Sequence, residues 1–308
     1  MSYHVVSIDA PRCSITVARG QLIVAEDNGA THSIPLEDVA SIVVTSFKCT
    51  MTNAFLVEAA RHRVGLVVCD SYAPATLMLP VDRATDTAII RNLANLSLQS
   101  KRRLWAKTLN AKCMNQCMLA ENWIAGHETI PLMKKLARSE KETRESEVAK
   151  MYWGIFADKW CGGIFVRRKD GSGVNALLNY AYAILLSLVL RNLLAFGIDP
   201  TFGIFHQSRA HATPLAYDLM EPFRIAFDCR VANWICAHPE LSQEDFAVTK
   251  EYRQFIGNTL DMVLDYEGKN LSLRATVEHV VRSFRKTVEQ NQVGPYTPWT
   301  TSTTKWDG

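Results

Sequence analysis

The apolar positions in the first eighty residues fall in short runs that are rich in β-branched side chains. Four such runs are YHVVSI at 3–8, CSITVA at 13–18, QLIVAE at 21–26 and ASIVVT at 40–45. Turn residues such as Asp27–Gly29 separate them, which predicts short strands. A helical pattern follows over 52–62, with Thr52 as its N-cap, and then another strand over 64–70. Residues 1–80 are therefore predicted to form a small β-rich domain with one helix.

From about residue 84 the apolar positions recur at helical spacing. The helices that this spacing predicts cover residues 84–97, 98–124, 143–157, 174–196, 213–235, 248–264 and 271–290. The whole pattern predicts an α+β protein, in which a connecting helix over 81–97 leads from the β-rich domain to a larger all-helical domain over 98–290. The polar, Pro- and Thr-rich residues 291–308 are expected to form a mobile tail.

The most apolar window lies at 176–198 and contains Asn179 and Arg191. Its uninterrupted apolar run is shorter than the roughly 18–20 residues needed to cross a bilayer, so a buried helix is predicted. The first ten residues lack the basic region and long apolar core of a signal peptide. The eight cysteines include no CxxC pair, which favours free thiols in a reducing compartment. We therefore expect a cytoplasmic protein.

The composition is that of a folded protein, because 48% of the 308 residues are apolar and 21% are charged. The net charge of +3 is unevenly distributed along the chain. Residues 1–80 hold five Lys or Arg and seven Asp or Glu, a balance of −2, which leaves +5 for the remainder. A polyanion should therefore prefer the C-terminal part. The sequence contains neither a Walker P-loop nor a GxSxG nucleophile elbow, which argues against an NTPase of that kind and a serine hydrolase.

Two acids lie three residues apart in the predicted helix over 213–235. At this spacing Asp218 and Glu221 share one helix face, beside apolar side chains. A carboxylate in such surroundings is costly unless it is paired or bound to a cation. One interpretation is an ion pair between Glu221 and Arg224. The other adds His206, which follows an apolar stretch, and gives a mixed nitrogen and oxygen set of the kind that binds Mn²⁺ or Mg²⁺.

A third ligand could come from the predicted helix over 143–157. Glu145 and Glu147 lie in its first turn. Acids at this position commonly do no more than interact favourably with the helix dipole, and that alternative stays open from the residues alone.

Several stretches, in this order, make the whole chain resemble the CRISPR adaptation integrases. They are the spacing from Glu145 to Tyr152, NALLNYAYAILL at 175–186, GIDPTFGIFH at 197–206 and LAYDLMEPFRIAFD at 215–228. The order of the two parts, β-rich first and helical second, also resembles the organisation of that family. The spacing and the glutamate in the last position most resemble the branch that accompanies a single-protein, RNA-guided nuclease (type II).

The resemblance implies a metal site and its ligands. Carried over to this sequence, the ligands of Mg²⁺ or Mn²⁺ are Glu145, His206 and Glu221, and Asp218 is an acid that assists the site. Ser146 replaces the glycine that usually follows the first glutamate, so Glu147 stays open as an alternative ligand.

The resemblance also implies the reaction and the partners. The expected reaction is a metal-dependent transesterification, in which the 3′-hydroxyl of a protospacer duplex attacks a phosphate at the edge of the CRISPR repeat. The expected assembly is a homodimer, joined through the β-rich domains, that binds a small ferredoxin-like adaptation protein and double-stranded DNA. Two alternatives stay open: a structure-selective nuclease that acts on branched DNA, and a non-catalytic DNA-binding scaffold.

Basic residues are expected to hold the DNA backbone. The candidates are Lys101, Arg102, Arg103, Lys107 and Lys112 in one helical stretch, Arg167, Arg168 and Lys169 in a loop, and Arg224. Phosphate contacts of this kind position a duplex without reading its sequence. The alternative for the helical stretch is a solvated helix face, and Arg224 could instead anchor the acids.

Overall fold

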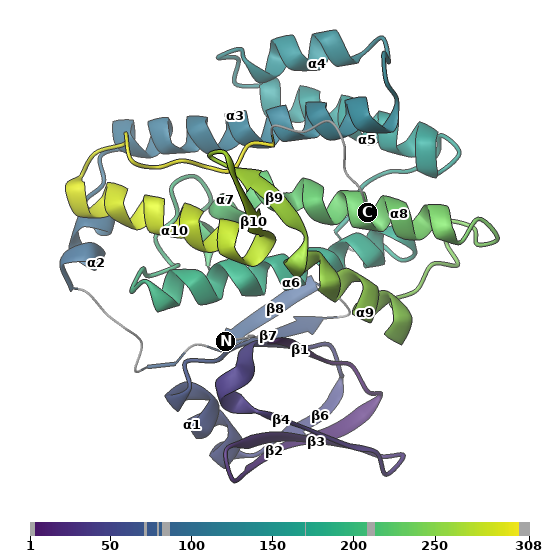
Figure 1. Cartoon of the computed structure of the whole chain (residues 1–308), viewed down its shortest axis with the longest axis vertical. Helices are drawn as coiled ribbons and strands as arrows, with labels where there is room; N and C mark the ends of the chain where they lie inside the picture. The colour runs from purple at the N-terminus through teal and green to yellow at the C-terminus, as the bar shows by residue number, and fades with distance from the viewer. Residues whose placement is uncertain are drawn as a thin grey trace.

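A computed structural model describes residues 4–70, 73–78, 80–81, 87–169, 171–207 and 213–301. Figure 1 shows a β-rich N-terminal part below a larger, mainly helical part, so the predicted α+β class is confirmed. Residues 82–86 of the predicted connecting segment lie outside the described residues, and a helix, α2 (Thr87–Ala94), follows them.

The β-rich part consists of two four-stranded sheets. The first has the order β1 (His4–Ile8), β5 (Val39–Val44), β7 (Gly65–Asp70) and β8 (Ala73–Met78). The second has the order β4 (Thr31–Pro35), β3 (Gln21–Glu26), β2 (Arg12–Ala18) and β6 (Lys48–Met51). A short 3₁₀ turn, η1 (Leu36–Asp38), leads into β5. Buried side chains such as Ile15, Leu22 and Ile42 fill the space between the sheets.

Helix α1 (Asn53–Arg61) packs against this β-rich part through Phe55. The predicted cap is confirmed, because the side chain of Thr52 accepts a hydrogen bond from the amide of Phe55 over 3.2 Å. Strands β1, β2, β3, β5 and β7 were predicted, whereas β4, β6 and β8 were not. The side chains of β4 and β6 are half-buried or exposed, so neither has the apolar run by which the predicted strands were recognised.

The helical part contains eight α-helices among the described residues besides α2, together with two 3₁₀ turns and a hairpin. The first helices are α3 (Leu98–Trp123), α4 (Ile130–Ala137), α5 (Arg144–Trp160) and α6 (Val174–Ala195). Next come α7 (Pro214–Met220), η2 (Glu221–Phe223), α8 (Arg224–Ala237), α9 (Lys250–Gly257) and η3 (Asn258–Asp261). The chain continues through β9 (Val263–Tyr266), β10 (Lys269–Ser272) and α10 (Leu273–Gln290).

Helix α6 is the centre of the molecule. It packs against β5 and β7 on one side and against α7, α8 and α10 on the other, as Figure 1 shows. The hydroxyl of Tyr180 on α6 reaches Ser7 on β1 over 2.5 Å and joins the two parts. Within the described residues α6 alone is long and apolar enough to cross a membrane, but 83% of its most apolar window is buried inside the protein. The prediction of a buried helix is confirmed.

Three parts of the helical prediction need correction. The helix predicted over 213–235 is divided into α7, η2 and α8, because Pro222 has no N–H to continue the helical ladder. The helix predicted over 248–264 ends at Gly257, and β9 and β10 form an antiparallel hairpin whose turn residues Glu267 and Gly268 both have positive φ. Helix α4 was not predicted at all. The domain is therefore not wholly helical.

The expectation of a mobile tail over 291–308 is wrong for residues 291–301, which pack against α3. The ring of Tyr296 is fully buried, and its hydroxyl lies 2.8 Å from that of Thr108. The indole of Trp299 is buried and stacks on Phe223, with ring centroids 5.5 Å apart. The side chain of Asn115 donates to the carbonyl of Trp299 over 3.1 Å. Polar composition suggested mobility, but two aromatic rings supply the apolar surface that anchors the segment. Residues 302–308 lie outside the described residues.

Candidate metal and DNA site

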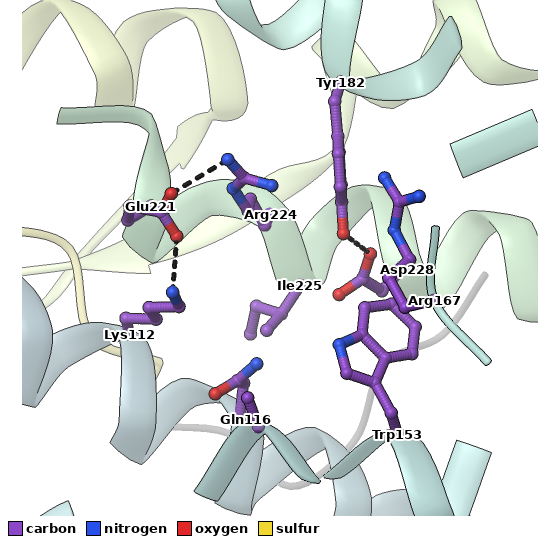
Figure 2. A pocket seen from close by; sticks show the side chains of 10 residues that line it. Lys112, Gln116, Trp153, Arg167, Tyr182, Glu221, Arg224, Ile225 and Asp228 are labelled. Atoms are coloured by element: carbon purple, nitrogen blue, oxygen red, sulfur yellow. Dashed lines mark hydrogen bonds and ion pairs between the residues drawn. The ribbon is translucent and has the colours of Figure 1, made fainter. Parts of the chain in front are cut away.

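Two of the acids predicted as metal ligands converge on one lysine. Glu145 lies in the first turn of α5, and Glu221 begins η2, where α7 ends. The ammonium of Lys112 on α3 lies 2.6 Å from Glu145 Oε1 and 2.8 Å from Glu221 Oε2. Figure 2 shows Lys112 below Glu221, with Arg224 on the other side of the same carboxylate. The guanidinium of Arg224 lies 2.8 Å from Glu221 Oε1.

The surrounding charges keep Glu221 ionised although its side chain is only 5% exposed. Burial alone would raise the pKa of Glu221, but the positive charges of Arg224 and Lys112 outweigh burial and lower that pKa to about 2. Burial opposes the charge on Lys112 too, yet Glu221 and Glu145 raise the pKa of Lys112. Glu221 Oε2 meets the ammonium of Lys112 at 2.8 Å and has no further hydrogen-bond partner among the described residues.

His206 is held from behind by Asp218, a fully buried acid on α7. Asp218 Oδ1 lies 2.7 Å from Nδ1 of His206. The same carboxylate accepts the backbone N–H groups of Ile204, Phe205 and His206 over 2.7, 3.1 and 3.1 Å. Because Asp218 acts as an acceptor throughout, Nδ1 is the donor, and Nε2 carries the imidazole lone pair.

The loop that carries His206 approaches α7 closely at Gly203. A Cβ at this position would lie 2.3 Å from the carbonyl oxygen of His206 and 2.8 Å from Cβ of Pro214. The imidazole also meets the indole of Trp105 edge-on, with ring centroids 5.9 Å apart. These contacts fix the loop at Gly203 and His206, on the side of the molecule where Glu221 lies.

A cavity of about 110 Å³ opens beside Glu221 (Figure 2). Its polar lining comprises Lys112, Gln116, Arg167, Tyr182, Arg224 and Asp228. Asp228 is buried and accepts hydrogen bonds from the hydroxyls of Tyr182 and Tyr152 over 2.5 and 2.8 Å. Burial raises the pKa of Asp228 to about 6, although the two tyrosines counteract it. The guanidinium of Arg224 lies over the ring of Tyr182, 4.6 Å from its centroid.

The profile of the protein family described as CRISPR associated protein Cas1 matches residues 6–273. The chain belongs to this family. A curated relative, the CRISPR-associated endonuclease Cas1 of Neisseria meningitidis serogroup C, is 29% identical over 277 residues, which cover 88% of each chain. The sequence resemblance to the adaptation integrases is thereby confirmed at the level of the family.

Solved structures agree on the fold. A casposase bound to integration product superposes with a TM-score of 0.79 at 19% identity, covering 94% of this chain and 91% of the other. A Cas6-RT-Cas1–Cas2 complex gives a TM-score of 0.79 at 18% identity, covering 97% of this chain and 36% of the longer one. At these identities the likeness shows that the Cas1 fold is shared.

This Cas1 family member does not hold a preassembled cluster of three His, Cys, Asp or Glu side chains within its described residues. Glu145 and Glu221 face the same ammonium, whereas Glu147 accepts a hydrogen bond from the hydroxyl of Thr143. The arrangement brings Glu145 rather than Glu147 to Glu221. The role of each acid and of His206 in metal binding stays a prediction.

Apart from Lys107 and Lys112, the basic residues predicted to contact DNA fall into two groups. Arg102, Arg103, Arg168 and Lys169 are exposed, and Lys101 is half-buried. Arg167 and Arg224 line the cavity beside Glu221. The loop over 167–169 is fixed to α6, since the backbone N–H of Arg168 donates to Asn175 over 2.7 Å and Asn179 donates to the carbonyl of Lys169 over 2.7 Å.

Two lysines assigned to the basic surface of α3 turn inward instead. Lys107 donates to the backbone carbonyls of Val293, Gly294 and Tyr296 over 3.0, 3.0 and 2.8 Å, which anchors the C-terminal segment. Lys112 pairs with the two acids. Sequence reasoning also missed Gln116 and Asp228 as part of this site. Gln116 follows Lys112 by one helical turn, and that spacing is the one signal that could have placed it there.

Proposed function

We propose that this Cas1 family member is a divalent-metal-dependent DNA integrase of CRISPR adaptation. In the proposed reaction, the 3′-hydroxyl ends of protospacer DNA are joined to the CRISPR repeat by transesterification. The observation that carries the proposal is the convergence of Glu145 and Glu221, from separate helices, on one cation position. The relative from Neisseria is named an endonuclease, and the similar casposase was solved with integration product, which supports chemistry on DNA phosphodiesters.

The donor atoms suit Mg²⁺ or Mn²⁺. The side chains that would hold the ion are Glu145 and Glu221, through carboxylate oxygens, and His206, through Nε2. Glu221 Oε2 is buried, and among the described residues its close partner is the ammonium of Lys112, so a divalent ion that replaced this ammonium would find a carboxylate oxygen to bind. When bound, the ion would polarise a phosphoryl oxygen and stabilise charge on the attacking or leaving oxygen.

Other side chains of the site hold the proposed ligands in the required charge state and orientation. Arg224 keeps Glu221 charged and in place through its 2.8 Å contact. Asp218 takes the hydrogen bond of Nδ1 and thereby fixes the tautomer and orientation of His206, as carboxylates commonly do behind histidine ligands. The exposed residues Arg102, Arg103 and Arg168, together with Lys101 and Lys169, would hold DNA phosphates outside the site.

We further propose a homodimer joined through the β-rich parts, which binds double-stranded DNA and a small ferredoxin-like adaptation protein. The support for a second protein is the Cas6-RT-Cas1–Cas2 complex, in which a chain of this fold is found together with Cas2. Assignment to the branch that accompanies a single-protein, RNA-guided nuclease also stays a proposal.

The function can be tested with a labelled duplex that ends in 3′-hydroxyl groups and a supercoiled plasmid that carries the repeat. The protein, alone and with its small partner, is incubated with Mn²⁺ or with EDTA. We expect label to join the plasmid only with Mn²⁺. Glu145→Gln and Glu221→Gln should lower joining by at least about a hundredfold, because charge stabilisation by the ion is worth several kcal/mol. Glu121→Gln removes a comparable ion pair, with Lys134, away from the cavity and is the matched control.

The same assay separates the alternatives. Cutting of branched DNA without joining, abolished by the same two substitutions, would indicate a structure-selective nuclease. Joining that survives both substitutions in folded protein would contradict the proposed ligands and would favour a scaffold whose partner carries the activity.

A further inference from the structure

The position of Lys112 raises a question of charge within the proposed metal site. Two carboxylates, Glu145 and Glu221, face two cations, Lys112 and Arg224, at 2.6–2.8 Å. The formal charges therefore balance. The side chain of Lys112 is only 13% exposed, so solvent screens it weakly. A divalent ion added to this arrangement would leave an excess of two positive charges in a mostly buried place.

The ammonium and a divalent ion cannot share the position. Lys112 already contacts one oxygen of each carboxylate, and an ion bound to those two oxygens would lie within a few ångströms of the ammonium. Like charges at such a distance repel strongly where water is scarce. Arg224 contacts the other oxygen of Glu221, so it can remain in place. Lys112 is therefore the cation that has to move.

We propose that Lys112 is an internal counter-cation, which occupies the ion position in the metal-free protein and shifts into the neighbouring cavity when a divalent ion binds. This inference rests on the proposed metal site. It makes Lys112 a positioning residue that holds Glu145 and Glu221 together without metal and competes with the ion for them.

The neighbouring cavity can accommodate the ammonium of Lys112 after it leaves the ion position. Gln116 follows Lys112 by one turn of α3, and both side chains line the cavity of about 110 Å³, as Figure 2 shows. Gln116 is only 6% exposed, and its Oε1 accepts no hydrogen bond from the described residues. An unused, buried acceptor is costly, and an ammonium is a donor that would satisfy it. The carboxylate of Asp228 lines the same cavity and offsets part of the positive charge of Arg167 and Arg224, which also line it.

The test measures Mn²⁺ binding to the full chain without DNA, by the electron paramagnetic resonance signal of free Mn²⁺. Lys112→Met removes the charge and keeps the length of the side chain. We expect this variant to bind Mn²⁺ at least about tenfold more tightly than the wild type, because no internal cation opposes the ion. Its melting temperature without metal should be lower than that of the wild type, and Mn²⁺ should raise it by a larger amount.

Lys134→Met is the matched control, since Lys134 forms a 2.6 Å ion pair with Glu121 away from the cavity. It should bind Mn²⁺ like the wild type. Gln116→Leu in the wild-type background tests the second place of the ammonium independently, even if Lys112→Met does not fold. It should weaken Mn²⁺ binding severalfold, because the displaced ammonium loses its acceptor.

The outcomes separate the two ideas. If Glu145→Gln and Glu221→Gln leave Mn²⁺ binding unchanged, the proposed metal site is wrong, and the role of Lys112 is wrong with it. If these two variants weaken binding but Lys112→Met binds Mn²⁺ no more tightly than the wild type, the metal site stands and the counter-cation is overturned. Unchanged Mn²⁺ binding by Gln116→Leu would overturn the shift into the cavity.

Discussion

Asp218 lies directly behind His206, with Oδ1 2.7 Å from the Nδ1 of the imidazole. The same carboxylate accepts the backbone N–H groups of Ile204, Phe205 and His206. One buried acid on α7 therefore fixes both the path of the loop and the tautomer of the ring. This geometry gives a concrete meaning to the prediction that Asp218 assists the site, since Asp218 acts through His206.

Asp218→Asn is expected to lower both Mn²⁺ affinity and DNA joining about 10- to 100-fold, the usual cost of changing the partner behind a metal-bound histidine. The amide keeps the size of the side chain but is a poorer acceptor for Nδ1–H, so the preferred tautomer is lost. The readouts are Mn²⁺ binding without DNA and the joining assay. Asp199→Asn, which alters a hydrogen bond to Thr201 earlier in the same loop, is the control and should change Mn²⁺ affinity little. Equal losses from both variants would contradict a specific role for Asp218.

Gly203→Ala is expected to disturb the loop that presents His206. The added Cβ would meet the carbonyl oxygen of His206 at 2.3 Å, and backbone cannot yield as a flexible side chain does. We expect a fall of several degrees in melting temperature and a clear loss of joining. Gly154→Ala on α5 is the matched control, since its Cβ would meet no atom within 4 Å. It should leave joining unchanged and stabilise the helix by about 0.5–1 kcal/mol.

Local patterns predicted the elements whose apolar spacing is long and uninterrupted. The helices predicted over 98–124 and 174–196 are found at Leu98–Trp123 and Val174–Ala195. The hairpin of β9 and β10 was missed, and its two ends were included in the helices predicted over 248–264 and 271–290, because only four residues form each strand, too few to establish a period of two. The C-terminal segment was misjudged because its burial depends on Trp299 reaching Phe223, a contact between residues far apart in the sequence.

The candidate site shows the same limit. Its acids and histidine were recognisable because Asp218 and Glu221 lie in a predicted apolar helix. An ionised carboxylate in such surroundings is costly unless a cation or a hydrogen-bond donor pairs with it. Lys112 was instead counted with the basic surface of α3. The side chain of Lys112 points inward because α3 packs against α5. This packing brings Glu145, which is 33 residues away in the sequence, to the ammonium of Lys112. Asp228 was missed for the same reason, because the hydroxyl that donates to it belongs to Tyr152, which is 76 residues away in the sequence.

Trp299→Ala is expected to destabilise the protein by about 3–5 kcal/mol, the usual cost of removing a large buried aromatic side chain. The effect should extend to the site, because Trp299 stacks on Phe223, which belongs to the same 3₁₀ turn as Glu221. Urea unfolding measures the loss of stability, and the joining assay measures the effect on the site. Thr300→Ala, at an exposed neighbouring position, is the control. Stability equal to that of the wild type would contradict an anchored C-terminal segment.

Asp228 is expected to make the stability of the protein depend on pH. Burial raises the pKa of its carboxyl from the ordinary 3.8 to about 6, so the folded protein binds this proton more tightly than the unfolded chain does. The contribution of Asp228 to the free energy of unfolding is therefore largest below about pH 4 and falls by up to about 3 kcal/mol as the pH rises through 6. Asp228→Asn keeps a polar side chain of the same shape between Tyr152 and Tyr182 but cannot titrate. Urea unfolding at about pH 4 and about pH 7 should show the variant gaining stability relative to the wild type at the higher pH. The same difference at both pH values would contradict a raised pKa.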